Sequence, residues 1–200
     1  MTARSQLHWI TEAGMFFEKK GPVWETLRAL DARLHDAGIE YVVIGGLALN
    51  AHEYERQTVD VDVVIRRADF ERFKQALGGS YQPTGDTGRR FLDPRSEVNI
   101  DVLLAGELAR RRDRNKSIRF PDPAEAEVHG DVRTVSLACL IELKLVTWRY
   151  KDWGDVVELI RAHNLTETFT EQLDTTVQTA FRQCYDQATD PNYARPEEGS

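Results

Sequence analysis

The feature that most constrains this chain is a short apolar stretch with two aspartates at alternate positions, Thr58-Val-Asp-Val-Asp-Val-Val-Ile65. Valine and isoleucine favour β-strands, and successive side chains of a strand point to opposite faces. Asp60 and Asp62 therefore share one face of a strand predicted over 59–65, and the valines between them share the other. Two carboxylates held so close repel each other unless a cation neutralises them. The stretch is thus either a metal-binding strand or a strand with a solvent-facing acidic surface.

A second apolar strand, predicted over 98–104, carries a third carboxylate at Asp101, with no basic neighbour in sequence. If the two strands are adjacent, three carboxylates meet on one face. Hard oxygen ligands of this kind suit Mg²⁺ or Mn²⁺. A site for two such ions can clamp the attacking and leaving oxygens of a phosphoryl displacement.

Two glycines, Gly45 and Gly46, follow the β-rich run Tyr41-Val-Val-Ile44 and precede a helix predicted over 47–54. A strand that passes through glycine into a helix N-terminus exposes backbone N–H groups where an anion is favoured. The pair is therefore either a phosphate-binding turn or only a tight turn.

The remaining periodicity predicts an α/β (α+β) chain, with a mixed β-sheet flanked by helices and a C-terminal helical annex. We expect an N-terminal extension over 1–20, a core over 21–135, a helical region over 136–188 and a disordered tail over 189–200. Within these limits the spacing of apolar residues predicts helices over 23–37, 68–77, 137–150, 153–163 and 167–187, a hairpin over 81–92 and a strand over 128–135.

Composition narrows the function classes. The formal net charge of -7 provides no global basic field for nucleic acid, although a basic run over 110–119 is either a solvated loop or a phosphate-contacting patch. Two cysteines exclude a disulfide scaffold. The sequence has no signal pattern and no apolar run of the roughly 18 residues that span a bilayer. We therefore expect a cytoplasmic protein that does not enter the membrane.

The order of these elements resembles the nucleotidyltransferase superfamily, which includes DNA polymerase beta and the aminoglycoside and lincosamide nucleotidyltransferases. The shared pattern is strand, Gly-Gly, helix, Arg56-x-Thr58-x-Asp60-x-Asp62, and a later strand with a third acid, here Asp101. The resemblance implies a nucleotidyltransferase-type fold and a catalytic core over 21–135. It also implies that Gly45 and Gly46 hold a nucleoside triphosphate (NTP), that Asp60 and Asp62 bind two Mg²⁺ or Mn²⁺ ions, and that Asp101 binds the catalytic ion and helps deprotonate the acceptor.

A second block, Lys144 to Asp155, resembles small prokaryotic members of that superfamily, the toxin-like nucleotidyltransferases of abortive-infection and type IV toxin–antitoxin systems (AbiEii type). Lys144, Arg149 and Lys151 are candidate ligands of the triphosphate, and Lys144 is also a candidate catalytic residue. Asp152 joins the same nucleotide-binding set, or only caps the next helix. Arg56 either pairs with a phosphate or neutralises nearby acids, and Thr58 belongs to the same segment.

For three further side chains, the sequence predicts either a position or one of two roles. His52 is expected on the surface of its helix. Trp148 and Trp153 flank the basic block, where they either anchor the annex or stack on a base.

The leading hypothesis is an enzyme that moves a nucleoside monophosphate from an NTP to a hydroxyl of RNA, a protein or a small molecule, as a toxin of a toxin–antitoxin system or otherwise. Its partners would be the NTP, the acceptor, and a cognate antitoxin or a second copy of the chain. The alternative is a non-catalytic nucleotide-binding or antitoxin-like interaction module on the same fold.

Overall fold

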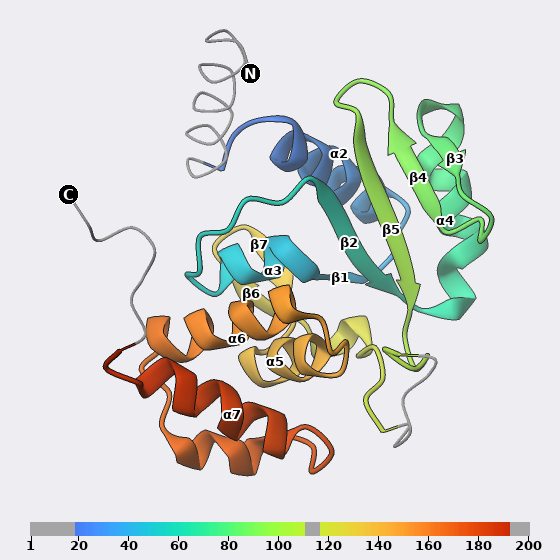
Figure 1. Cartoon of the computed structure of the whole chain (residues 1–200). Coiled ribbons are helices and arrows are strands. Elements are labelled where there is room, and N and C mark those ends of the chain that lie inside the picture. Colours follow the sequence, from blue (N-terminus) through green and yellow to red (C-terminus); the bar gives the residue numbers. More distant parts are fainter. Residues whose placement is uncertain (1–18, 111–116, 193–200) are drawn as a thin grey trace, which may run out of the picture.

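The structure, a computed structural model, describes residues 19–110 and 117–192. Its strands are β1 Tyr41–Ile44, β2 Asp60–Ile65, β3 Gln82–Thr84, β4 Arg90–Asp93, β5 Val98–Leu104, β6 Glu127–His129 and β7 Val132–Thr134. They form one seven-stranded sheet in the order β3-β4-β5-β2-β1-β7-β6 (Figure 1). Strand β2 pairs in parallel with β5, and β1 with β7, while the other neighbours are antiparallel. The predicted mixed sheet is confirmed.

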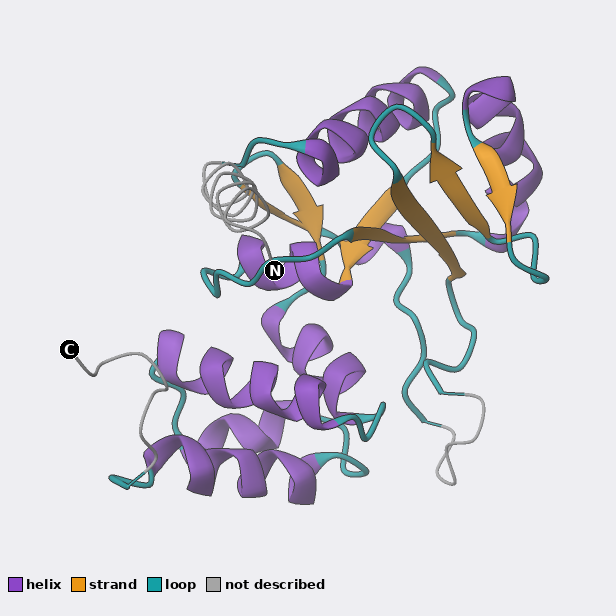
Figure 2. Cartoon of the chain, turned by 45° about the horizontal axis from the view of Figure 1, so that its top comes forward, coloured by secondary structure: helices purple, strands orange, loops and turns teal. Residues whose placement is uncertain are grey.

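Helices cover both faces of this sheet. They are α2 Pro22–Asp36, α3 Gly45–Ala51, α4 Phe70–Leu77, α5 Leu137–Leu145, α6 Tyr150–Ala162 and α7 Gln178–Thr189. Short 3₁₀ turns lie at η1 Arg67–Asp69, η2 Gly78–Ser80, η3 Pro123–Glu125 and η4 Glu167–Gln172. Figure 2 shows the helices in two groups with the strands between them, which confirms the α/β class.

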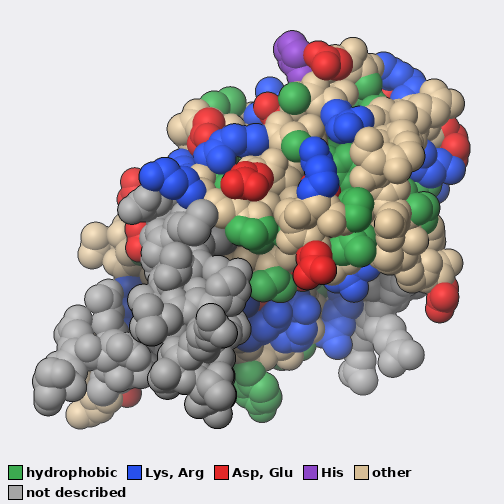
Figure 3. All heavy atoms as spheres, turned by 90° about the horizontal axis from the view of Figure 1, so that it is seen from above, with side chains coloured by type: hydrophobic (Ala, Val, Ile, Leu, Met, Phe, Trp, Pro, Cys, Tyr) green, Lys and Arg blue, Asp and Glu red, His purple; other side chains and the backbone are tan. Residues whose placement is uncertain are grey.

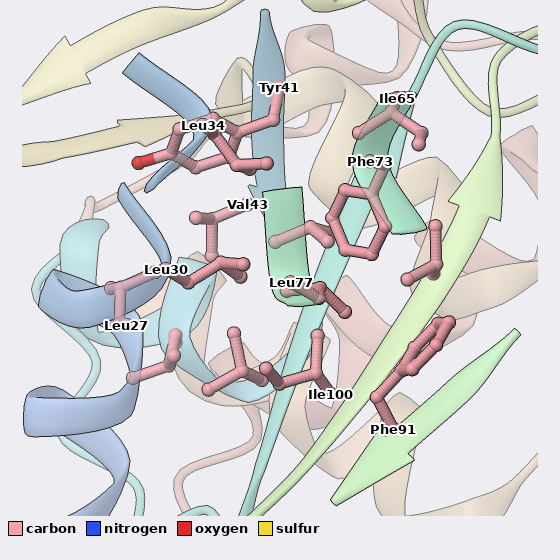
Figure 4. Packing of buried hydrophobic residues seen from close by; sticks show 14 of the residues in the cluster. Leu27, Leu30, Leu34, Tyr41, Val43, Ile65, Phe73, Leu77, Phe91 and Ile100 are labelled. Atoms are coloured by element: carbon pink, nitrogen blue, oxygen red, sulfur yellow. The ribbon is translucent and has the colours of Figure 1, made fainter. Parts of the chain in front are cut away.

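The first core lies between the sheet and the pair α2 and α4. Helix α2 buries Leu27, Leu30 and Leu34, whose spacing of three and four residues places them on one side of a helix. They meet Phe73 and Leu77 of α4 over the sheet residues of this face (Figure 4). The sheet contributes alternate residues of its strands to this cluster, among them Val61, Val63, Ile65, Ile100, Val102 and Leu104.

The second core lies on the opposite face, under α5, α6 and α7. Val42, Ile44 and Val64 reach it from the sheet, because they alternate with the strand residues that enter the first core. Phe181 of α7 and Leu140 of α5 are fully buried there. The annex thus shares a core with the sheet.

Several predicted boundaries were wrong. Helix α3 spans Gly45–Ala51 instead of 47–54, and α6 begins at Tyr150 instead of residue 153. Three further differences are larger. The single strand expected over 128–135 is the hairpin β6–β7, because Gly130 adopts a φ of 65° and reverses the chain. The helix expected over 137–150 begins as predicted, with Ser136 Oγ accepting from the Cys139 N–H at 3.3 Å, but ends at Leu145. The helix expected over 167–187 is divided into η4 and α7.

The described surface agrees with a chain of mixed charge. On the face seen in Figure 3, acidic and basic side chains are interspersed. Within the described ranges, no helix is long and apolar enough to cross a membrane. Most of the basic run over 110–119, the extension up to residue 18 and the tail from residue 193 lie outside the described residues.

Candidate active site

The three predicted carboxylates lie on one face of two adjacent strands. Asp60 and Asp62 are the first and third residues of β2, and the parallel register sets Asp62 opposite Asp101 of β5. Figure 1 shows these two strands side by side. Neighbouring strands are about 4.8 Å apart, and paired residues point to the same side. The fold therefore brings together acids that are about 40 residues apart in sequence, on the face that also carries α3 and the annex.

Burial and mutual repulsion disfavour the ionised forms of Asp62 and Asp101. Burial raises the pKa of Asp62 to about 6, and the charges of Asp101 and Asp60 act in the same direction, against the opposite effect of Lys144 and Arg149. Burial likewise raises the pKa of Asp101, which Arg90 opposes and Asp60 reinforces. A carboxyl group whose ionised form is disfavoured in this way gains from a nearby cation.

Gly45 lies against Asp62, which explains why this position carries no side chain. Its φ is 71°, and a Cβ atom built there would lie 2.1 Å from Asp62 Oδ2. The next residue, Gly46, is restricted by contact alone, because a Cβ atom would lie 2.6 Å from Thr58 Oγ1. The two glycines thus let the start of α3 approach the acid-bearing strand more closely than any other residue would allow.

Arg90 is a site residue that the sequence analysis missed. Strand β4 pairs with β5 so that Arg90 lies opposite Asp101. Its Nε is 3.1 Å from Asp101 Oδ1, and its Nη2 is 3.6 Å from Asp60 Oδ1. The alternation of the hairpin places Arg90 on a defined face of β4. Which strand that hairpin would join is a long-range contact with no signal in local sequence.

The donor set fits a divalent cation in chemistry, although the side chains are not closed around one. Three carboxylates on one face, one of them with a strongly raised pKa, match the oxygen ligands that Mg²⁺ and Mn²⁺ prefer. As the side chains stand, however, no three acidic, histidine or cysteine residues of the described chain are gathered tightly enough to hold an ion. The guanidinium of Arg90 bridges two of the three acids instead.

Lys144 is buried, so it is neither on a solvated helix face nor directed into open solvent. Its side chain is 8% exposed, and its Nζ lies 2.8 Å from Asp155 Oδ2 and 3.2 Å from Asp152 Oδ1. Arg56 completes the group, with Nη1 3.1 Å from the same Asp155 oxygen. Arg56 therefore pairs with an acid of α6, 99 residues away, and its ion pair is not with the neighbouring Asp60 or Asp62.

Asp152 lies in the first turn of α6 and does not cap it, because Arg149 is the N-cap and no side chain bonds the free N–H groups. Its Oδ2 accepts from Thr147 Oγ1 at 2.6 Å and from Arg149 Nε at 2.5 Å. Arg149 is 60% exposed, and Lys151 is exposed beside it. Both Lys144 and Arg149 are close enough to lower the pKa of Asp62, so this block adjoins the acid cluster.

The two tryptophans differ in burial. Trp153 is half-buried against the second core, which fits an anchoring role. Trp148 is 62% exposed and has a φ of 58°, and its ring centroid is 5.5 Å from that of Trp153. Anchoring therefore describes Trp153 and not Trp148.

His52 is buried, contrary to the surface position expected for it. It is 2% exposed, its Nε2 lies 2.7 Å from the Val135 carbonyl oxygen, and its own carbonyl oxygen lies 2.8 Å from His163 Nε2. Burial lowers the pKa of its imidazole. Its position four residues after Ala48 and three after Leu49, both buried, was a helical signal that could have revealed this.

A cavity lies at the N-terminal ends of β2 and β5. It has a volume of about 180 Å³ and includes Thr58 and Val59, which lead into Asp60, together with Val98 and the first residues of α2. Val59 is 65% exposed at its edge. The cavity thus opens beside the acid-bearing strands.

Comparisons with known proteins gave matches among solved structures. A scan against protein-family models found no match, and a search of curated proteins found none. The solution structure of the antibiotic-resistance factor ANT(2'')-Ia is similar with 19% identity and a TM-score of 0.47, over 80% of this chain and 90% of that one. The crystal structure of ANT(2'')-Ia in complex with adenylyl-2''-tobramycin is similar with 20% identity and a TM-score of 0.48, over 80% and 97%. At this level of identity, the function of the chain has to be inferred from its own residues.

Proposed function

We propose that this chain is a divalent-metal-dependent nucleotidyltransferase, which moves a nucleoside monophosphate from an NTP to a hydroxyl group. The observation that carries this proposal is the register that sets Asp62 of β2 beside Asp101 of β5, with Asp60 on the same face. Carboxylates placed together at the cost of mutual repulsion are characteristic of sites that act on a charged ligand. The order of Gly-Gly, acid pair and third acid along the chain agrees with the same activity.

Two Mg²⁺ or Mn²⁺ ions, when bound, supply the positive charge that offsets the triphosphate and the developing charge of the reaction. Asp60 and Asp62 would hold both ions, and Asp101 would hold the one on the acceptor side. The three carboxylate side chains would have to move closer together around the ions.

The reaction forms a bond between the acceptor oxygen and the α-phosphorus, and it breaks the bond from that phosphorus to the bridging oxygen of the leaving pyrophosphate. The proton of the acceptor hydroxyl passes to a carboxylate oxygen of Asp101, the acid that would lie on the acceptor side. The pyrophosphate carries away the bonding electrons.

The triphosphate would lie against the start of α3. Gly45 and Gly46 let the start of α3 pack closely against Asp62 and Thr58, and its backbone N–H groups would be directed towards the triphosphate. Arg149 and Lys151 are exposed, and Arg149 is close enough to Asp62 to lower its pKa. Both side chains would contact phosphate oxygens of the triphosphate. Lys144, Asp152 and Arg56 support the surface from inside, since their charges are already engaged with one another and with Asp155.

The acceptor is RNA, a protein side chain or a small molecule, and a cognate antitoxin or a second copy of the chain remains a predicted partner. The test is incubation with each α-labelled NTP, Mg²⁺ or Mn²⁺, and total RNA, cell lysate or candidate small molecules. We expect label to appear in one acceptor class and unlabelled pyrophosphate to be released in step with it.

Asp62→Ala should abolish labelling while the circular dichroism spectrum stays that of the folded chain. Asp86→Asn, at an exposed turn of the β3–β4 hairpin, is the matched control and should retain full labelling. Full transfer by Asp62→Ala would overturn the proposal. Calorimetry that finds NTP binding independent of Mg²⁺, without transfer, would favour the non-catalytic nucleotide-binding module.

A further inference from the structure

Building on the proposed function, we propose that Arg90 is an internal counterion of the acid site. In the metal-free protein its guanidinium takes the place of a divalent ion between Asp60 and Asp101, and it withdraws when the ion binds. Arg90 thereby sets the concentration of Mg²⁺ or Mn²⁺ at which the site fills.

The contacts of Arg90 are those of a charge placed between two acids. Its Nε lies 3.1 Å from Asp101 Oδ1, and its Nη2 lies 3.6 Å from Asp60 Oδ1. The Nε is shielded from solvent and meets no acceptor with hydrogen-bond geometry within the described chain, in spite of the short distance to Asp101. The contact is therefore mainly Coulombic. A cation of higher charge density can replace the guanidinium without the loss of a directional hydrogen bond.

The side chain has room to leave. It is 43% exposed, while the two carboxylates it contacts are 33% and 34% exposed. The backbone of Arg90 is fixed in β4 by its pairing with Asp101, so only the side chain can swing. An ion pair of this exposure contributes little to stability, and its rupture is a small part of the energy of metal binding.

The same bridge accounts for the open arrangement of the acids. The carboxylates of the described chain are not gathered around a point that could hold an ion. A guanidinium is a large planar cation that contacts carboxylate oxygens through its N–H groups. It cannot draw those oxygens into the short distances that Mg²⁺ requires. Closure of the site around an ion therefore requires that Arg90 move away from Asp60 and Asp101.

The test measures Mn²⁺ binding in the absence of nucleotide, by calorimetry and by the electron paramagnetic resonance signal of free Mn²⁺. We expect Arg90→Gln to bind Mn²⁺ about tenfold more tightly than the parent chain, which corresponds to about 1.4 kcal/mol. Arg90→Lys, which keeps the charge, should bind within about threefold of the parent chain. If Arg90→Gln does not fold, Arg90→Met provides the second neutral variant.

The neighbouring Arg89 offers the matched control. Its Nη1 lies 2.5 Å from Glu107 Oε2, away from the three acids, so Arg89→Gln should leave Mn²⁺ affinity unchanged. A second readout is thermal unfolding in EDTA, where Arg90→Gln should unfold at a temperature only slightly below that of the parent chain, because the lost ion pair is exposed. Added Mn²⁺ should then raise the unfolding temperature of Arg90→Gln by more than that of the parent chain.

The outcomes separate this inference from the proposed function. Unchanged or weaker Mn²⁺ binding by both neutral variants, with normal binding by the parent chain, overturns the role of Arg90 and leaves the metal site standing. Absence of Mn²⁺ binding in the parent chain and in every Arg90 variant overturns both. Loss of binding in Asp62→Asn verifies that the ion measured is the one held by the three acids.

Discussion

At the scale of single residues, Gly45 shows how closely the helix start and the acid-bearing strand approach. Its positive φ alone disfavours any other residue by about 1 to 2 kcal/mol. The overlap of an added Cβ with Asp62 Oδ2 is a separate cost that falls on the site itself. The two costs can be measured separately, because the chain has another glycine with a positive φ where an added Cβ atom would meet no other atom.

Gly45→Ala should therefore reduce the free energy of unfolding by about 2 kcal/mol more than Gly85→Ala. Gly85 has a φ of 72°, but no atom lies within 4 Å of the position that a Cβ atom would take there. Urea unfolding of the two variants measures the difference. Equal losses would show that Asp62 moves aside freely and that contact with Gly45 does not define the site.

Asp62 links the site to the stability of the metal-free protein. Its folded pKa of about 6 is above the ordinary value of 3.8, so the folded state binds the proton more tightly than the unfolded state. This contribution to stability is fully present below about pH 4 and is lost as the pH rises to about 6. A shift of about two pKa units corresponds to about 3 kcal/mol.

Asp62→Asn should accordingly be more stable than the parent chain at pH 7 in EDTA, and the difference should shrink as the pH falls towards 4. Urea unfolding at several pH values gives the difference, with Asp86→Asn as the control that should show none. A gap that stays constant with pH would mean that Asp62 is not destabilised by its neighbours. Saturating Mg²⁺ should narrow the gap, because it stabilises only the chain that can bind it.

At the scale of elements, the joint between α5 and α6 is held by charge. Lys144 at the end of α5 lies between Asp152 and Asp155 of α6, and all three are buried. Asp155 also receives Arg56 from the segment between α3 and β2, so four charges connect the annex to the site segment. A helix over 137–150 was predicted because the apolar spacing continues past Leu145. It ends at Leu145, and the next residues leave the helical path: Thr147 Oγ1 donates to Asp152, and Trp148 has a positive φ.

Lys144→Met should destabilise the chain by about 3 to 5 kcal/mol, since it leaves two buried carboxylates with less positive charge. The matched control is Lys74→Met, whose lysine forms an exposed pair with Glu71 in α4 and should change stability by less than about 1 kcal/mol. Chemical unfolding of both variants measures the two losses of stability. A small loss for Lys144→Met would indicate that the network is not needed for the fold and would return Lys144 to a direct role at the triphosphate.

At the scale of the whole molecule, the sheet has one core on each face. The annex core includes Val42, Ile44 and Val64, which belong to the same strands as the residues of the first core. Because α5, α6 and α7 cover that face, loss of annex packing exposes the sheet. We therefore expect the described chain to unfold as one cooperative unit.

Phe181→Ala should reduce stability by about 3 to 5 kcal/mol, because this α7 side chain is fully buried. Tyr150→Ala, whose ring is 95% exposed, should have little effect. Hydrogen exchange of the β1 and β2 amides should accelerate in Phe181→Ala together with that of the α7 amides. Slow exchange retained in β1 and β2 alone would show that the annex unfolds separately.

Local periodicity was sufficient to predict much of the fold and part of the site. The alternation in 59–65 and 98–104 determined which face each acid takes, because strand side chains alternate whatever the strand pairs with. The amphipathic spacing of 23–37 and 68–77 similarly located α2 and α4 to within two residues. Chain order alone placed Gly45 and Gly46 after a strand and beside a helix start, and the structure includes both glycines in the first turn of α3.

Tertiary structure alone decided what those elements meet. The neighbourhood of β2 and β5, and hence of Asp62 and Asp101, depends on strand pairing across a long sequence separation. The same holds for Arg90 at the acids, for the burial of Lys144 between two α6 carboxylates, and for the interior position of His52. The physical reason is that backbone periodicity is a local property of sequence. The partner of a charge is selected by packing over the whole chain, and that selection turned three separated acids into one candidate site with an arginine across it.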